Sequence, residues 1–191
     1  MHVLVNAATS ADGKLSSRRR EQIAISGPAD FDRVDRIRAD SDAVMVGVGT
    51  VLADDPSLTL DDPGRRADRE ARGEPPNPAR VVADSNLRTP TDARILDDAA
   101  ETYLLATATV DEAAVEDAEA AGATVIRAGE ERVDLPAALD RLEAEGVGRL
   151  MIEGGGELIF SLLADGLVAD LSVFVCPTVI GRPGAPTLVA G

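Results

Sequence analysis

Residues 149–160 read RLMIEGGGELIF, and this stretch determines the fold that we expect for the chain. Residues 150–152 form a short apolar run, which is typical of a buried strand. Three glycines follow, and apolar residues then recur at helical spacing until Gly166, a glycine in the position that commonly ends a helix. The stretch therefore predicts a strand, a glycine turn and a helix in succession.

The three glycines of this turn are suited to an anionic ligand. Glycine lacks a Cβ atom, so a ligand can approach the backbone closely. The first N–H groups of the following helix have no intrahelical partner, and the helix dipole adds partial positive charge that favours a phosphate. Glu153 stands at the carboxyl end of the strand, where open α/β sheets keep their ligands. The alternative interpretation is a tight turn that binds nothing.

The turn differs from the dinucleotide-binding fingerprint of the Rossmann fold. The pattern G-x-G-x-x-G is absent, and no acidic residue stands about 20 residues further on, where that fingerprint expects one. Residues 173–175, Val-Phe-Val, stand there instead. The sequence thus supports phosphate binding but not the ordinary Rossmann fold.

Strands alternate with helices along the rest of the chain. Further strands are predicted near residues 2–8, 43–46, 80–84, 102–106, 124–126 and 168–175. This alternation predicts an α/β fold with a central, mostly parallel sheet flanked by helices. Polar residues that follow the strand ends should converge at one edge of the sheet, and they are Thr9, Asp12, Thr50, Asp54, Asp84, Ser85 and Glu153.

Two segments between these strands carry their own predictions. Residues 61–78 are charged, rich in Gly and Pro and without periodicity, which predicts a long surface loop with solvated arginines. A helix is expected after Pro28, with Ser26 as its cap and Arg38 near its end. Arg38 either bonds the last carbonyls of that helix or points its guanidinium at a substrate phosphate.

The composition fits a single domain of 191 residues, of which 45% are hydrophobic. No apolar run is long enough for a membrane span, and we expect no signal peptide. Cys176 is the only cysteine, which excludes an intrachain disulfide and fits a reducing cytoplasm. With His2 as the only histidine, a His-based metal site and a Ser-His-Asp triad are disfavoured.

The charge pattern is strongly acidic, with a net charge of −15 and Lys14 as the only lysine. Nucleic acid is disfavoured as a partner, because binding to its phosphates needs a basic face. An acidic surface with almost no lysine favours a protein adapted to high salt, where screening removes the self-repulsion. An ordinary acidic cytosolic protein from a GC-rich genome is the alternative.

Four blocks of sequence then occur in a familiar order: SADGK at 10–14, TVLADDPSLT at 50–59, DSNLRTP at 84–90 and EGGG at 153–156. Together they resemble the pyrimidine reductases of riboflavin biosynthesis. That family includes the reductase domain of the bacterial bifunctional deaminase/reductase and the archaeal 2,5-diamino-6-(ribosylamino)-4(3H)-pyrimidinone 5′-phosphate reductase. The resemblance runs from about residue 3 to about residue 189, so residues 1–191 are expected to form one reductase domain.

The resemblance implies a dihydrofolate-reductase-like fold, NADPH as the hydride donor, a phosphorylated ribosylaminopyrimidine as substrate, and a homodimer. The implied reaction opens the ribose as an imine and reduces C1′ to give a ribitylamino chain. Residues assigned to the cofactor are Thr9, Thr50, Asp54, Asp84, Ser85, Gly154, Gly155, Gly156 and Glu157. Residues assigned to the substrate are Gln22, Arg38, Leu58 and Glu153, with Arg38 at the phosphate, and the candidate catalytic residues are Glu153 and Asn6.

The chain departs from the family pattern in three places. Asn6 stands where bacterial members carry a lysine, so it can only hydrogen-bond, which fits the archaeal branch better. Asp61 stands where a basic residue is expected for a phosphate contact. The family continues beyond Gly191 with strand-forming sequence, which leaves truncation as one interpretation. One Cys and one His also cannot build the zinc site of the deaminase domain.

Two alternative functions stay open at this point. A dihydrofolate reductase shares the fold and cofactor and needs an acid in its first helix, which Asp30, Asp32 or Asp35 could supply. The block at 50–59 argues against it. A non-catalytic nucleotide-binding module would keep the glycine turn without turnover.

Overall fold

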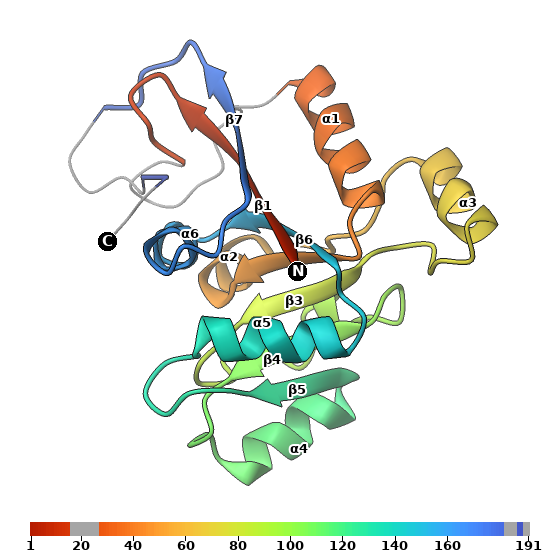
Figure 1. The fold of residues 1–191 in the computed structure, drawn as a ribbon, viewed down its shortest axis with the longest axis vertical. Coiled ribbons are helices and arrows are strands. Elements are labelled where there is room, and N and C mark those ends of the chain that lie inside the picture. The colour runs from red at the N-terminus through yellow and green to blue at the C-terminus, as the bar shows by residue number, and fades with distance from the viewer. Residues whose placement is uncertain (16–26, 182–186, 189–191) are drawn as a thin grey trace.

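The computed structural model describes residues 1–15, 27–181 and 187–188, and Figure 1 shows how they are arranged. In chain order, the elements are β1 (His2–Ser10), α1 (Pro28–Ala39), β2 (Ala43–Gly47), α2 (Val48–Asp54), α3 (Pro63–Ala71), β3 (Ala79–Ala83), the 3₁₀ helix η1 (Arg94–Leu96), β4 (Thr102–Ala106), α4 (Glu112–Ala120), β5 (Ala123–Arg127), α5 (Leu135–Ala144), β6 (Arg149–Gly154), α6 (Gly156–Ala164) and β7 (Asp170–Cys176).

The strands form a single seven-stranded sheet in the order β5-β4-β3-β2-β6-β1-β7. Every neighbouring pair in it is parallel. The prediction of an α/β fold with a mostly parallel sheet is therefore confirmed. The three strands β2, β6 and β1 lie side by side in the sheet, although β6 comes more than a hundred residues after the others in sequence.

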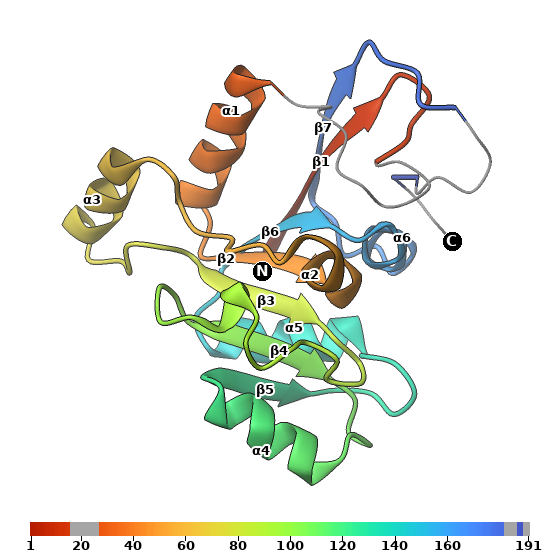
Figure 2. The same cartoon turned by 180° about the vertical axis from the view of Figure 1, so that it is seen from behind.

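Each face of the sheet has its own apolar core. Leucines of α5 and α6, among them Leu139, Leu142 and Leu162, pack on one face, which is nearer to the viewer in Figure 1. The opposite face, seen in Figure 2, is covered by Val51 of α2, Ala118 of α4 and residues of η1, with α1 packing beside them. Burying apolar area on both faces is what stabilises an open parallel sheet.

The segment 61–78 does not form the long surface loop that the sequence predicted. It contains α3, which begins with Asp62 as N-cap, whose side chain accepts a hydrogen bond from Gly64 N, followed by Pro63 in the first turn. Its arginines are not all solvated either, because Arg69 is 3% exposed. The segment lacks apolar periodicity because its buried contacts come from arginine hydrogen bonds.

The helix α1 was predicted correctly, but its cap was not. The N-cap is Gly27, with Pro28 in the first turn, and no side chain caps the helix. Ser26, the predicted cap, lies outside the described residues. From this start α1 extends to Ala39, and it carries Arg38 to the carboxyl end of β6 and Arg33 to the middle of β1.

Candidate active site

The predicted strand, glycine turn and helix are present as β6, Gly155 and α6. Gly155 has φ +94°, a conformation that residues with a side chain rarely adopt. A Cβ atom there would also lie 3.3 Å from the backbone nitrogen of Gly47. A Cβ atom on Gly154 would lie 3.2 Å from Thr50 Oγ1. The β6–α6 turn therefore packs closely on the β2–α2 turn, which brings Gly154 and Thr50 together at the edge that the sequence predicted.

Glu153 stands at an irregularity of β6. Met45 of β2 pairs with Ile152, and the next residue, Val46, pairs with Gly154, so Glu153 is an extra residue between them. Such bulges bend a strand and redirect a side chain. The carboxylate of Glu153 is directed to α1, where it meets Arg38.

Arg38 and Glu153 form a two-pronged ion pair. Arg38 Nε donates to Glu153 Oε1 at 2.5 Å and Nη2 donates to Oε2 at 2.6 Å, while Nη1 donates to the carbonyl of Thr59 at 2.9 Å. The side chains are 18% and 10% exposed. Burial alone would lower the pKa of Arg38, but its hydrogen bonds to Glu153 outweigh burial and raise that pKa. A guanidinium carries five N–H groups, so bonds through three of them leave two for another ligand.

A second arginine of α1 reaches Asn6. Arg33 Nη2 donates to Asn6 Oδ1 at 2.9 Å, and Nη1 donates to Ser172 Oγ of β7 at 2.7 Å. Asp30 Oδ1 accepts from both Nε and Nη2 of Arg33, and the side chain of Asp30 is only 2% exposed. Sequence reasoning missed Arg33, because its partners on the sheet lie 27 and 139 residues away in the chain.

Asn6 and Glu153 lie on neighbouring strands. Val5 of β1 is the register partner of Ile152 of β6, so Asn6 and Glu153 are the next residues along these two strands. Both side chains meet arginines of the same helix, α1, and Asn6 is 6% exposed. The two candidate catalytic residues are therefore brought together under α1.

The turn after β3 is rigid. Asp84 is fully buried, and its Oδ2 accepts from Thr89 N at 2.7 Å and from Thr89 Oγ1 at 2.8 Å. Its Oδ1 has no hydrogen-bond partner among the described residues, and Arg88 Nε lies 4.0 Å from it. The hydroxyl of Ser85 accepts from Val133 N at 3.2 Å. In the structure these two residues hold the turn and its neighbouring loop together.

The remaining predicted residues have more varied positions. Thr9 is 3% exposed on β1. Asp54 ends α2, one turn after Thr50. Leu58 is 4% exposed in the apolar core, with φ +52°, a strained conformation of the kind often found at functional sites. Gln22 lies outside the described residues.

Asp61 occupies the position where the family pattern expects a basic residue. Its backbone N–H donates to Asp35 Oδ1 at 2.8 Å, and Arg65 Nη1 donates to Asp35 Oδ2 at 2.7 Å. Burial would raise the pKa of Asp35, but Arg65 and the backbone N–H groups of residues 61 and 62 hold it below its usual value. Residues 61–65 are thus attached to α1 through Asp35, one of the acids of that helix.

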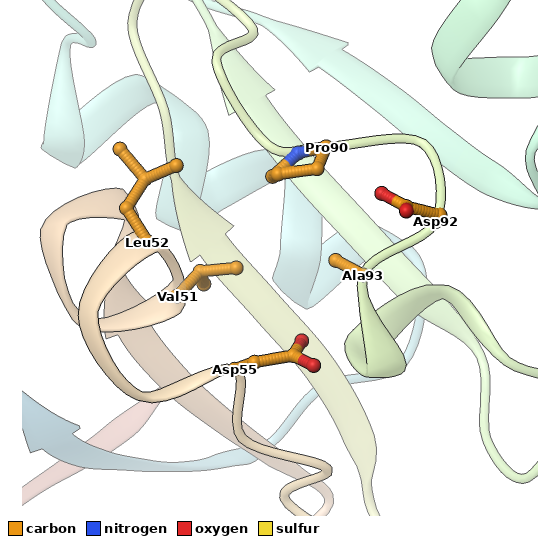
Figure 3. Close-up of a pocket in the computed structure, with 6 residues that line it drawn as sticks. All are labelled: Val51, Leu52, Asp55, Pro90, Asp92 and Ala93. Atoms are coloured by element: carbon orange, nitrogen blue, oxygen red, sulfur yellow. The ribbon is translucent and has the colours of Figure 1, made fainter.

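A surface pocket of about 240 Å³ lies beside α2, as Figure 3 shows. It is lined by Val51, Leu52, Asp55, Pro90, Asp92 and Ala93. The loop from Pro90 to Ala93 faces α2 across it. None of the residues assigned to cofactor or substrate lines this pocket, although Val51 and Asp55 directly follow the assigned Thr50 and Asp54 in the chain.

Two further observations concern metal ions and membranes. Within residues 1–15, 27–181 and 187–188, no group of three or more His, Cys, Asp or Glu side chains could hold a metal ion. In the same residues, no helix has the length and apolar character to cross a membrane.

Comparison with known proteins gives a consistent result. The family described as the RibD C-terminal domain matches residues 1–191. The chain is 47% identical over 190 residues to the 2,5-diamino-6-ribosylamino-4(3H)-pyrimidinone 5′-phosphate reductase of Archaeoglobus fulgidus, covering 100% of this chain and 86% of the relative. It is 42% identical over 190 residues to the reductase of the same name from Methanothermobacter thermautotrophicus, covering 100% of this chain and 84% of the relative.

A solved structure agrees at the level of the fold. The pyrimidine reductase-like protein of Corynebacterium diphtheriae superposes with a TM-score of 0.84 at 20% identity, covering 99% of this chain and 79% of that chain. This likeness concerns the fold alone. The dihydrofolate-reductase-like fold that the resemblance implied is confirmed.

Proposed function

The chain belongs to the RibD C-terminal domain family, and on that premise we propose its substrate and cofactor. It is a reductase, an oxidoreductase of riboflavin biosynthesis. Its proposed reaction is the NADPH-dependent reduction of 2,5-diamino-6-(ribosylamino)-4(3H)-pyrimidinone 5′-phosphate to the ribitylamino product. The observation that carries the proposal is the full-length match to two archaeal reductases of that name.

The glycine turn supports a nicotinamide dinucleotide at the carboxyl edge of the sheet. The absence of side chains at Gly154 and Gly155 lets the two strand–helix turns meet, and the first N–H groups of α6 lie at that junction. Thr50 adds a hydroxyl beside it. When bound, the nicotinamide supplies the hydride, and the protein supplies position and charge. We propose NADPH rather than NADH, because no ribose-binding acid follows the turn at the spacing of the NAD fingerprint.

The ion pair under α1 supports a phosphorylated sugar as substrate. The Arg38 guanidinium keeps two N–H groups beyond those given to Glu153 and Thr59, and these are proposed to meet the phosphate. Glu153 fixes the orientation of that guanidinium and is proposed to contact the ribosyl group. Asn6, on the neighbouring strand, is proposed to donate a hydrogen bond to the substrate.

An apolar edge of the sheet supports a homodimer. Among the strands that the structure describes, β7 pairs with β1 alone, and its side chains Leu171, Val173 and Val175 are 51%, 36% and 59% exposed. A second copy of the chain is proposed to cover them. Light scattering at working salt is expected to give the mass of two chains, and a fully active monomer would count against the dimer.

The acidic surface supports a cytoplasmic protein that works in high salt. The net charge of −15 repels itself most in the compact state, so screening should stabilise the fold. The melting temperature is expected to climb from dilute buffer to molar potassium chloride, and sodium chloride should act alike. A flat or falling curve would contradict the salt adaptation.

The experiment for the reaction is a cofactor-oxidation assay with several substrates. The ribosylaminopyrimidine phosphate should cause loss of NADPH absorbance, while dihydrofolate should not. Turnover of dihydrofolate alone would make the protein a dihydrofolate reductase. Cofactor binding without turnover of either compound would make it a nucleotide-binding module. The deaminated pyrimidine is added in the same assay to measure whether the protein also reduces it.

A further inference from the structure

Arg33 of α1 lies beside Asn6, and the family pattern assigns it no role; its side chain is 33% exposed, while that of its partner Asp30 is 2% exposed. Its guanidinium joins three elements, since it bonds Asp30 of α1, Asn6 of β1 and Ser172 of β7. Asn6 and Ser172 are register partners in the sheet. A residue that spans two strands and its own helix in this way is held in one orientation.

The chemistry of the guanidinium determines how the Asn6 amide is turned. A guanidinium has donors and no acceptor, so only the amide oxygen of Asn6 can face Arg33. Arg33 approaches from the β7 side, because the same group also bonds Ser172. The amide nitrogen points away from the oxygen and is therefore left toward β6, the strand that carries Glu153. Among the described residues, no hydrogen bond is made by Asn6 Nδ2.

The contact also changes the strength of that donor. A hydrogen bond from a charged group to the amide oxygen draws electron density from the nitrogen, and neighbouring hydrogen bonds strengthen one another in this manner. Asn6 is 6% exposed, so water screens the contact little on its side, whereas Arg33 is 33% exposed and paired with Asp30, which weaken the effect in part. The two N–H groups of Asn6 thus become better donors than those of a solvated asparagine.

We propose that Arg33 is a positioning residue, which locks and polarises the Asn6 amide so that its NH₂ group donates to an acceptor on the substrate beside Glu153. The acceptor would be an oxygen of the opened sugar chain. This inference rests on the proposed function for the identity of the substrate. The residue in contact with substrate is Asn6, and Arg33 acts through it.

Variants at both positions test this coupling. Arg33→Met removes the donors and is expected to lower kcat about tenfold, with the KM for NADPH unchanged. Asn6→Ala is expected to lower kcat roughly a hundredfold, as loss of a positioned donor commonly does. Asn6→Asp keeps a partner for Arg33 and loses the N–H groups, so it should be as slow as Asn6→Ala while melting at or above the wild-type temperature.

The double variant and a matched control separate positioning from structure. In the Asn6→Ala background, Arg33→Met should cause no further loss of kcat, because its target is already gone. Arg33→Lys, which keeps the charge without the fork, should recover part of the rate. Arg36→Met is the control on the same helix, since Arg36 pairs with exposed Asp32, and it should behave as wild type. An equal loss from Arg33→Met in both backgrounds, or none in the wild-type background, would overturn the proposal.

A readout that does not depend on turnover keeps this claim distinct from the proposed function. If the wild-type protein reduces no pyrimidine, the proposed function fails, and Arg33 is judged from the side-chain amide resonances of Asn6. These should shift in Arg33→Met and stay in place in Arg36→Met. Resonances that do not respond to Arg33→Met would refute the locking of Asn6.

Discussion

Two arginines of this protein with little exposure, Arg38 at 18% and Arg69 at 4% of the side chain, meet different partners. Arg69 of α3 donates to the backbone carbonyls of Ala39, Ser41 and Pro75, and its only carboxylate neighbour among the described residues is Glu74, at 3.4 Å. Burial lowers the pKa of Arg69, although nearby Glu74 partly opposes this. Arg38 instead bonds a carboxylate at the end of β6, and its pKa is raised.

The contrast separates a structural anchor from the arginine that we propose to bind substrate. The N–H groups of Arg69 hold three chain segments together at the margin of the sheet, away from the glycine turn. Arg38 keeps donors for a ligand and lies where the carboxyl ends of parallel strands meet, the usual position of ligands in such sheets. Low exposure alone therefore does not mark a substrate arginine; the position of Arg38 at the carboxyl ends of the strands is what supports the role proposed for it.

The largest expected effect is on activity, from the pair at β6. Glu153→Gln removes the charge that orients Arg38, and kcat/KM should fall roughly a hundredfold. The control is Glu112→Gln, because Glu112 makes the same two-pronged bond to Arg127 on the surface. Steady-state kinetics should leave that control at the wild-type rate. Equal activity of the two variants would contradict a specific role of the Arg38–Glu153 pair in the reaction.

The next effect is on stability, from the anchor. Arg69→Met removes the hydrogen bonds to the carbonyls of Ala39 and Ser41, which are buried, and to that of Pro75, so the free energy of unfolding should fall by about 3 kcal/mol while kcat of the folded protein is unchanged. Arg72 is an exposed neighbour on the same segment, and Arg72→Met should lower the free energy of unfolding by less than about 1 kcal/mol. Urea unfolding measures both. A large loss of kcat in Arg69→Met at temperatures where it is folded would contradict the anchor role.

A smaller effect is expected at the glycine turn. Gly155→Ala and Gly166→Ala both place a side chain at positive φ, at a cost of about 1–2 kcal/mol each. A Cβ atom at Gly166 meets nothing within 4 Å, whereas at Gly155 it meets Gly47. Gly155→Ala should therefore lose more stability and also raise the KM for NADPH. Identical KM values in the two variants would show that the close packing of the turns does not shape the cofactor site.

The smallest effect concerns pH and lies outside both regions. Asp12 accepts hydrogen bonds from Ser10 Oγ and from Ile180 N and Gly181 N, which lower its pKa from 3.8 to about 2. A depressed folded pKa stabilises the protein above the ordinary value, and this contribution is lost as pH falls from about 4 to 2. Asp12→Asn should therefore flatten the acid limb of the stability curve. If the stability curve of Asp12→Asn kept the same acid limb, the lowered pKa of Asp12 would be contradicted.

Sequence patterns predicted the parts of the fold that depend on local order. Apolar runs gave the strands, and the strand, glycine turn and helix at residues 149–166 formed as expected, because each depends on neighbouring residues. The helix α3 was missed because hydrogen bonds of its arginines, not an apolar face, attach it to the rest of the protein. The Arg38–Glu153 pair was not predicted, although both residues were assigned to the site, since 115 residues separate them.

The central claim is tested most directly by mixing the purified protein with NADPH and 2,5-diamino-6-(ribosylamino)-4(3H)-pyrimidinone 5′-phosphate and identifying the product by mass spectrometry. The account predicts oxidation of NADPH in equal amount to a product heavier by the two hydrogen atoms that reduction adds, and much slower formation of it by Glu153→Gln. Unchanged pyrimidine and unoxidised NADPH, with the protein folded and at working salt, would contradict the account.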